Sequence, residues 1–166
     1  MSMKSVLSLA VIAVASVALI GPSHEASAAD VTISASVVAA CTLTGADIQF
    51  GAYMIGQTSD SDAQDNITYN CGADRNVTLE LDFGGNPNGT TNRNMIGAVN
   101  SQLLPYNLYQ DVTRTTVWGE GAAGLDVPDT EAGNVDVPVF GRIDGGAGAP
   151  ADTYSDTVTF NLTING

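Results

Sequence analysis

Few side chains in this 166-residue sequence could carry out covalent or acid–base chemistry. The only histidine is His24 and the only lysine is Lys4, and both precede residue 30. If residues 1–29 are removed, as their pattern indicates below, no Ser-His-Asp triad, Cys-His pair, lysine Schiff base or His-ligated zinc site can form. The sequence therefore predicts no catalytic, cofactor-binding or metal-binding residues, no cofactor, and a protein that is not an enzyme.

Acidic side chains are plentiful, with 18 Asp and Glu against 5 Lys and Arg. The segment Asp60-Ser-Asp62-Ala-Gln-Asp65 has some of the spacing of a calcium loop. Its sixth position is not glycine, however, and its twelfth is Cys71 rather than glutamate, so an EF-hand is excluded. A solvated acidic loop is the favoured interpretation, and an irregular calcium site stays open as the alternative.

A second acidic region surrounds Trp118 and raises the question of a glycosidase, which needs a pair of carboxylates. Nothing in the pattern singles out one pair, so enzymatic activity is not predicted. A weak carbohydrate-binding role, in which Trp118 or Tyr109 stacks on the sugar, remains an alternative. The acidic residues concerned are Asp111, Glu120, Asp126, Asp129 and Glu131.

Residues 1–29 have the pattern of a secretory signal peptide. Lys4 supplies a positive charge, residues 6–20 form an apolar run, and Ala26-Ser27-Ala28 offers a small-x-small cleavage pattern. The run falls short of the roughly 20 residues that a membrane-spanning helix needs. We therefore expect export across the inner membrane and cleavage beside Ala28 or Ala29.

The two cysteines, Cys41 and Cys71, belong to the exported part of the chain. In an oxidising compartment an isolated pair predicts one disulfide, and the Cys-x-x-Cys spacing of a redox or metal motif is absent. The net charge of −13 argues against nucleic acid and anionic membranes as partners, because both attract Lys and Arg.

Apolar and polar residues alternate with the two-residue period of half-buried strands, and β-branched and aromatic residues dominate the apolar positions. No stretch has the apolar stripe of a capped helix. Alternation of this kind indicates antiparallel sheets, and the fold class predicted is an all-β, immunoglobulin-like β-sandwich. The alternating runs are 67–71, 77–83, 104–108, 135–139 and 154–164.

Two positions break the regular pattern. Pro138 lies inside a strand pattern, so we expect that strand to be an edge or to carry a bulge there. Between Cys41 and Phe50 the apolar frame shifts by one residue, which predicts a bulge or a strand switch near Gly45-Ala46.

The two ends of the exported chain complement each other. Residues 30–40 form an alternating apolar strand without Gly, Pro or Lys, and the last run, 154–164, leaves only two residues after it. From residue 41 onward the sandwich appears one strand short, and an open apolar edge would aggregate unless covered. Residues 30–40 are either an ordinary first strand or a strand donated to another molecule, and the pattern leaves both open.

Several segments, taken in order, resemble the spore coat protein U domain family, which includes subunits of archaic (Csu-type) chaperone–usher pili. They are Cys41-Thr-Leu-Thr-Gly, Phe50-Gly-Ala-Tyr, Ile67-Thr-Tyr-Asn-Cys71, Leu104-Pro-Tyr-Asn-Leu-Tyr-Gln-Asp111, Trp118-Gly, Pro138-Val-Phe-Gly-Arg-Ile143 and Thr153-Tyr-Ser-Asp-Thr-Val. The resemblance spans nearly the whole exported chain.

The resemblance implies an incomplete, pilin-type sandwich over residues 41–166 that lacks its last strand, preceded by a donor strand at 30–40. The family pairs Cys41 with Cys71. A periplasmic chaperone fills the groove first, and at an outer-membrane usher the donor strand of an identical or related subunit replaces it, building a homopolymeric cell-surface fimbria for adhesion and biofilm formation. The implied donor residues are Val31, Ile33, Ala35 and Val37, and the implied acceptor residues are Val158, Phe160, Leu162 and Ile164.

Two other interpretations stay open at this point. One is a self-contained, secreted, lectin-like binding module in which residues 31–40 fold into their own domain. The other is a spore-coat-type surface protein.

Overall fold

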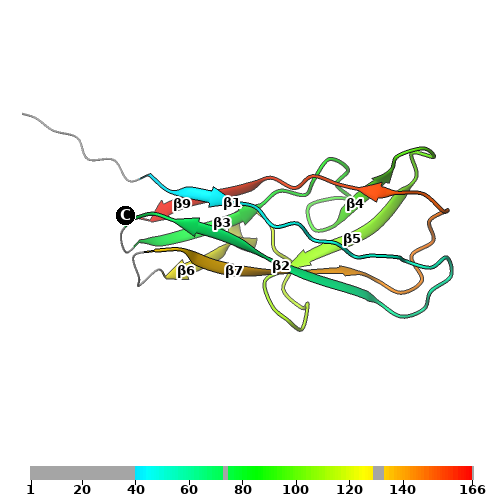
Figure 1. The fold of residues 1–166 in the computed structure, drawn as a ribbon, viewed down its shortest axis with the longest axis horizontal. Coiled ribbons are helices and arrows are strands. Elements are labelled where there is room, and N and C mark those ends of the chain that lie inside the picture. Colours follow the sequence, from blue (N-terminus) through cyan, green and yellow to red (C-terminus); the bar gives the residue numbers. More distant parts are fainter. Residues whose placement is uncertain (1–39, 73–74, 129–132, 166) are drawn as a thin grey trace, which may run out of the picture. The chain divides into compact units, whose positions relative to one another are not determined.

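The computed structural model describes residues 40–72, 75–128 and 133–165, and the regular structure in these residues is almost all β-strand, joined by loops (Figure 1). The exception is a single 3-10 turn, η1, at Gly121–Ala123. Within these ranges no helix has the length and apolarity needed to span a membrane. The strands are β1 Thr42–Thr44, β2 Ser61–Asn70, β3 Asn76–Leu81, β4 Arg93–Gly97, β5 Leu103–Tyr109, β6 Leu125–Pro128, β7 Val135–Ile143, β8 Tyr154–Ser155 and β9 Phe160–Asn165.

The strands form two antiparallel sheets. One has six strands in the order β1-β2-β7-β5-β4-β8, and the other has three in the order β6-β3-β9. The longest ladder joins β2 and β7, with Ser61 opposite Ile143 at one end and Tyr69 opposite Val135 at the other. The predicted antiparallel, all-β architecture is confirmed.

Inward-facing side chains of both sheets build one core. The alternation seen in the sequence is the alternation of burial: along β3 the apolar positions are buried and the polar ones between them are not. Trp118 is fully buried, and its Nε1 donates a hydrogen bond to the Leu79 carbonyl at 2.9 Å. The largest fully buried side chains are Trp118, Arg93, Tyr69, Leu79, Ile143, Val77 and Val139.

A buried arginine ties the sheets together. Arg93, at the start of β4, is 0% exposed and donates to main-chain carbonyls of the other layer. Its Nη2 lies 2.6 Å from the Asp82 carbonyl and 2.7 Å from the Trp118 carbonyl, and Nη1 lies 3.1 Å from Asn107 Oδ1. A buried charge is tolerable only with such partners, and these fix the end of β3 against β4 and β5.

The run 154–164, predicted as one strand, is two strands in different sheets. β8 pairs with β4, and β9 pairs with β3. Two carboxylates hold the crossover: Asp82 accepts from the Thr159 and Gly84 amides, and Asp156 accepts from the Gly85 amide, each at 2.9 Å. Asp156 interrupts the apolar positions at this switch, but Tyr154, Val158 and Phe160 stay in one frame, and the run was therefore predicted as a single strand.

The two irregular positions have local explanations. β7 lies between β2 and β5, but Pro138 is opposite Asn66 of β2, in the part of β7 that β5 does not reach. Its missing N–H therefore costs no ladder hydrogen bond to β5. At the other position, β1 ends at Thr44, immediately before Gly45, and residues 45–50 belong to no strand.

Candidate functional site: an open groove beside β9

The inner face of β9 is less covered than that of its neighbour β3. Val77 and Leu79 of β3 are 0% exposed and Leu81 is 3% exposed, yet their partners in register, Ile164, Leu162 and Phe160, are only half-buried. Both strands face the same core, so the difference arises on the outer side of β9. That side has no neighbouring strand among the described residues.

A groove runs along this uncovered side. Its larger hollow, of about 480 Å³, lies between residues 45–50 on one bank and 153–160 on the other. Its smaller hollow, of about 440 Å³, is lined by Cys41 and Leu43 opposite Leu162 and Ile164. We call the combination of these hollows the β9 groove. The chain runs in opposite directions along the two banks, so a strand laid between them is parallel to one bank and antiparallel to the other.

The floor of the larger hollow is the core itself. It is lined by core side chains that are each at most 5% exposed, namely Ile67, Leu81, Leu108 and Val139. A hollow that reaches core side chains is an unfilled part of the core rather than a surface dimple. Packing of protein interiors to crystal-like density leaves few such voids, which indicates that a further apolar element belongs here.

One polar pair lies at the end of the larger hollow. The Tyr106 hydroxyl donates to Asp156 Oδ2 at 2.7 Å, and the Tyr106 ring contacts Phe50 edge-to-face with centroids 6.0 Å apart. Burial and the hydrogen bond to Asp156 raise the pKa of Tyr106 well above its ordinary value. Tyr106 therefore stays a neutral donor that holds Asp156, and with it the β8–β9 crossover, in place.

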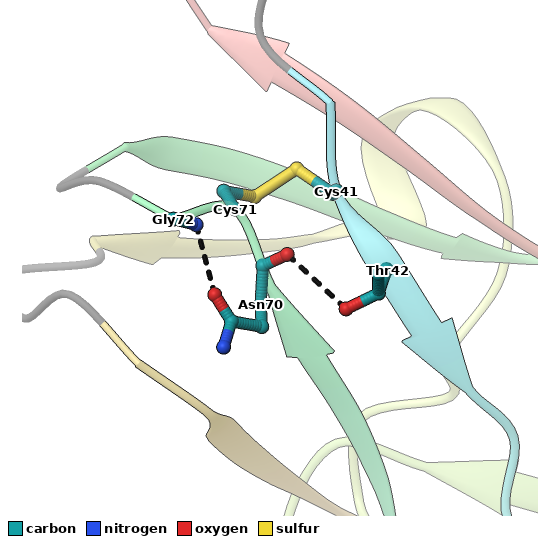
Figure 2. The surroundings of a disulfide bond; sticks show 5 residues. All are labelled: Cys41, Thr42, Asn70, Cys71 and Gly72. Atoms are coloured by element: carbon teal, nitrogen blue, oxygen red, sulfur yellow. Dashed lines mark hydrogen bonds between the residues drawn. A yellow bond between two sulfur atoms is a disulfide. The ribbon is translucent and has the colours of Figure 1, made fainter.

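The other bank is fastened where the chain enters the domain. Figure 2 shows the disulfide between Cys41 and Cys71, which joins the residue before β1 to the residue after β2. Next to it, Thr42 Oγ1 donates to the Asn70 carbonyl at 3.4 Å. Further along, the Asp47 amide donates to Asp65 at 2.6 Å and Ser61 Oγ donates to the Phe50 carbonyl at 3.3 Å. Disulfide and hydrogen bonds together hold residues 41–50 apart from β9.

The predicted site residues fall in two groups. All four predicted acceptor residues lie on one bank of the β9 groove: Val158 and Phe160 in the larger hollow, Leu162 and Ile164 in the smaller. The predicted donor residues Val31, Ile33, Ala35 and Val37, and residues 1–29, lie outside the described residues.

Sequence reasoning missed the opposite bank. Ala46, Ile48 and Phe50 line it, and Gly141 leaves room for Phe50, because a Cβ there would lie 2.7 Å from the Phe50 ring. The frame shift at Gly45-Ala46 was the available signal, since it marks where the chain leaves the ladder to form this bank.

The carboxylates of the segment 60–65, which the sequence offered as a calcium site, form ion pairs and hydrogen bonds within the domain. Asp62 pairs with Arg142 at 2.8 Å and with Arg114 at 3.3 Å, and Asp60 accepts from the Gly145 amide at 2.9 Å. Asp65 is held by the Asp47 amide. Among the described residues no cluster of three or more His, Cys, Asp or Glu side chains could hold a metal ion.

The suggested sugar-stacking role of Trp118 is wrong, because this side chain is 0% exposed in the core. Asp111, one of the acids near it, accepts hydrogen bonds from Thr113, Thr115 and Thr116, and these lower the pKa of Asp111 well below its usual range. It caps a loop as a permanent anion and is unsuited to donate a proton. Asp129 and Glu131 lie outside the described residues.

Comparison with known proteins agrees with this architecture. The family model of the Spore Coat Protein U domain matches residues 27–161. "Protein U" of Myxococcus xanthus is 29% identical over 171 residues, covering 93% of this chain and 95% of the relative.

Among solved structures, a chain of the CsuC–CsuE chaperone–tip adhesion subunit pre-assembly complex, from archaic chaperone–usher Csu pili of Acinetobacter baumannii, superposes with a TM-score of 0.58. The identity is 19%, and the match covers 76% of this chain but only 40% of that one. The P pilus rod subunit PapA superposes with a TM-score of 0.49 at 17% identity, covering 75% of this chain and 99% of that one.

The fold and the groove define a class: an incomplete, immunoglobulin-like β-sandwich in which, over the described residues, the last strand has one edge without a neighbour. Within that class the family match over residues 27–161 is decisive, and the chain belongs to the Spore Coat Protein U domain family.

Proposed function

We propose that this chain is a structural subunit of a surface pilus assembled by the chaperone–usher pathway through donor-strand exchange. The observation that carries the proposal is the β9 groove, a partly apolar channel that reaches the core beside an edge of β9 with no neighbouring strand among the described residues. The occupant we propose is residues 30–40 of another copy, with Val31, Ile33, Ala35 and Val37 facing the core. In this proposal the disulfide-linked domain comprises residues 41–166, and the donor strand comprises residues 30–40.

The energetics favour a durable joint. Burying each Val or Ile side chain contributes about 1.5–3 kcal/mol, and each added main-chain hydrogen bond contributes about 0.5–1.5 kcal/mol. Head-to-tail insertion between identical copies is a heterologous contact that does not close on itself, so a filament follows. The net charge of −13 keeps such filaments dispersed.

The same proposal places the chain in the cell. Residues 1–29 act as a signal peptide, a periplasmic chaperone covers the groove in transit, and an outer-membrane usher exchanges it for the next subunit. Surface attachment and biofilm formation are the roles we propose for the finished filament. Export, a chaperone and surface attachment are supported by the likeness to a chain of a chaperone–tip adhesion subunit complex, whereas biofilm formation follows from the family resemblance of the sequence alone.

Deletion of residues 30–40 tests the proposal, with electrophoresis of unboiled samples as the measurement. The oxidised exported chain should form a ladder, and the deletion should abolish it. A synthetic peptide of residues 30–40 should bind the deleted domain, whereas the matched peptide carrying Ile33→Asp should not. A ladder that survives the deletion contradicts the proposal. A soluble monomer that the deletion unfolds would instead support a self-contained, lectin-like module.

A further inference from the structure

We propose that the end of the domain carrying the β4–β5 hairpin is a second contact surface, which packs against the body of the next copy in the filament. The inference rests on the proposed function and adds to it an interface outside the β9 groove. We call its three exposed apolar side chains, Ile96, Val99 and Leu103, the hairpin patch.

The hairpin has the composition of an interface. Residues 94–110 contain no charged side chain, although the whole sequence carries a net charge of −13. Ile96 and Leu103 are direct cross-strand partners and are 38% and 45% exposed, and Val99 in the connecting turn is 88% exposed. Depletion of charged side chains is typical of the centre of a protein–protein contact. One carboxylate from outside the hairpin borders it, since Asp152 Oδ2 accepts hydrogen bonds from the Val99 and Asn100 amides at 2.9 and 2.7 Å.

The hairpin patch is continuous with one end of the β9 groove. Ile96 is paired with Ser155 of β8, and the Ala98 amide donates to the Thr153 carbonyl at 3.0 Å. Thr153 and Ser155 line the larger hollow. In Figure 1 the β4–β5 hairpin lies at the end of the domain opposite to the start of β1 and the end of β9.

The pairing of the sheet indicates which end of the groove faces the donor's own body. β6, β3 and β9 pair antiparallel throughout, and a donor antiparallel to β9 continues that pattern. Antiparallel pairing is also slightly more stable per residue than parallel pairing. Such a donor has Asp30 at the disulfide end of the groove and Val37 at the end with the larger hollow. The donor therefore leaves the acceptor at the hairpin end.

The segment between the donor residues and the donor's own domain is too short to hold that domain away from the acceptor. Only Val38, Ala39 and Ala40 connect the donor residues to Cys41 of the donor's own domain. Four residue steps separate Val37 from Cys41, and in an extended chain they reach at most about 14 Å. The body of the next copy must then lie against the hairpin end, and the hairpin patch is the apolar surface it meets. The turn at residues 51–57, with Met54 and Ile55 exposed to 67% and 72%, lies at the same end (Figure 1).

Site-specific photo-crosslinking in assembled filaments tests this surface. A benzophenone amino acid replaces Val99 in the exported chain, and in a matched control it replaces Val112, an apolar side chain that is 64% exposed and belongs to the loop at 110–116. Both positions are on the surface, so neither replacement disturbs the core. Filaments are irradiated, and products are separated after boiling, which opens the joints between subunits.

We expect covalent dimers from position 99, with the cross-linked peptide in residues 41–166 of a second copy, and no dimers above the dark control from position 112. Filaments that form normally but give no dimers at position 99, or equal amounts from both positions, overturn this inference and leave the proposed function intact. If the peptide of residues 30–40 fails to bind the deleted domain and no filaments form, the proposed function fails, and this inference fails with it.

Discussion

The two outer strands of the three-stranded sheet differ in how they meet solvent. β6 and β9 both pair antiparallel with β3, on opposite sides. β6 has four residues and presents Asp126 and Pro128, whereas β9 has six residues and includes neither a charge nor a proline. Short length, charge and proline are the usual means of preventing edge-to-edge pairing. β6 is thus built as an end of the sheet, and β9 is built to be continued.

The contrast extends to the surroundings of each strand. Polar contacts to β3 do not account for the contrast, because Thr78 Oγ1 donates to Asp126 of β6 at 2.6 Å and accepts from Asn165 Nδ2 of β9 at 3.0 Å. Beside β9 the chain instead leaves a groove that opens into the core. An edge that no strand covers within the described residues, next to a hollow that reaches the core, lowers the stability of the isolated domain. Under the proposed function, a donated strand offsets that cost.

The largest effect should come from placing a charge in the β9 groove. Leu162→Asp should weaken binding of the 30–40 peptide by at least about a hundredfold. When the peptide inserts, it buries the new carboxylate without a partner, which costs several kcal/mol. The matched substitution on the other edge is Val127→Asp, also at a half-buried position. Titration calorimetry checks both. Equal loss of peptide binding in the two variants would contradict the distinction between the edges.

Removing the disulfide should be the next largest effect. Cys41→Ser with Cys71→Ser releases a closed loop of 30 residues and should lower the free energy of unfolding by about 3–4 kcal/mol. Urea unfolding of the peptide-bound domain measures this. Because Cys41 lies on the bank opposite β9, peptide affinity should fall as well. Unchanged affinity would show that this bank does not shape the groove.

Arg93→Ala should destabilise the β9 edge more than the β6 edge. It leaves the Leu81, Asp82 and Trp118 carbonyls without their donor and should cost about 2–3 kcal/mol, at the lower end of what several unsatisfied groups would give. Urea unfolding measures the total, with Arg93→Lys as the control that retains a charge and recovers part of the loss. Leu81 at the end of β3 pairs with Phe160 of β9, whereas the β6 ladder stops at Leu79. Amide exchange should therefore increase more in β9 than in β6, and the reverse order would contradict this arrangement.

The smallest expected effect is the loss of stability at acid pH that comes from the ion pair between Asp62 and Arg142. Hydrogen bonds from Arg142, opposed by some burial and aided by the charge of Arg114, lower the pKa of Asp62. A lowered pKa in the folded state stabilises the protein above the ordinary carboxyl pKa, and that contribution is lost as pH falls from about 4 through the folded value. Because Asp62 is exposed in part, the contribution is below about 1 kcal/mol. Asp62→Asn should remove this pH dependence, seen in unfolding curves between neutral and acid pH, without changing peptide binding, because the pair lies on β2–β7 rather than at β9.

Alternation in the sequence was enough to predict antiparallel sheets and the inward-facing positions Val158, Phe160, Leu162 and Ile164, because a two-residue period directly encodes which face is buried. The acceptor role of these four residues came from the family resemblance and stays a prediction. Alternation did not lead to the switch from β8 to β9, because Tyr154, Val158 and Phe160 stay in one frame although Asp156 interrupts it. Nor could it reveal that Arg93 and Trp118 are core residues, because their burial depends on carbonyls of distant strands. The opposite bank of the groove is made by a segment outside any strand, for which pattern alone has no template.

Hydrogen–deuterium exchange on assembled filaments addresses the two edges in one experiment. Amides of β9 and of residues 31–37 should exchange as slowly as those of β3, while the outward amides of β6 exchange quickly. Dissociating the filaments should release β9 and residues 31–37 together and leave β3 unchanged. Rapid exchange of residues 31–37 within intact filaments, or exchange of β9 as fast as that of β6, would contradict the idea that one copy completes the sheet of the next.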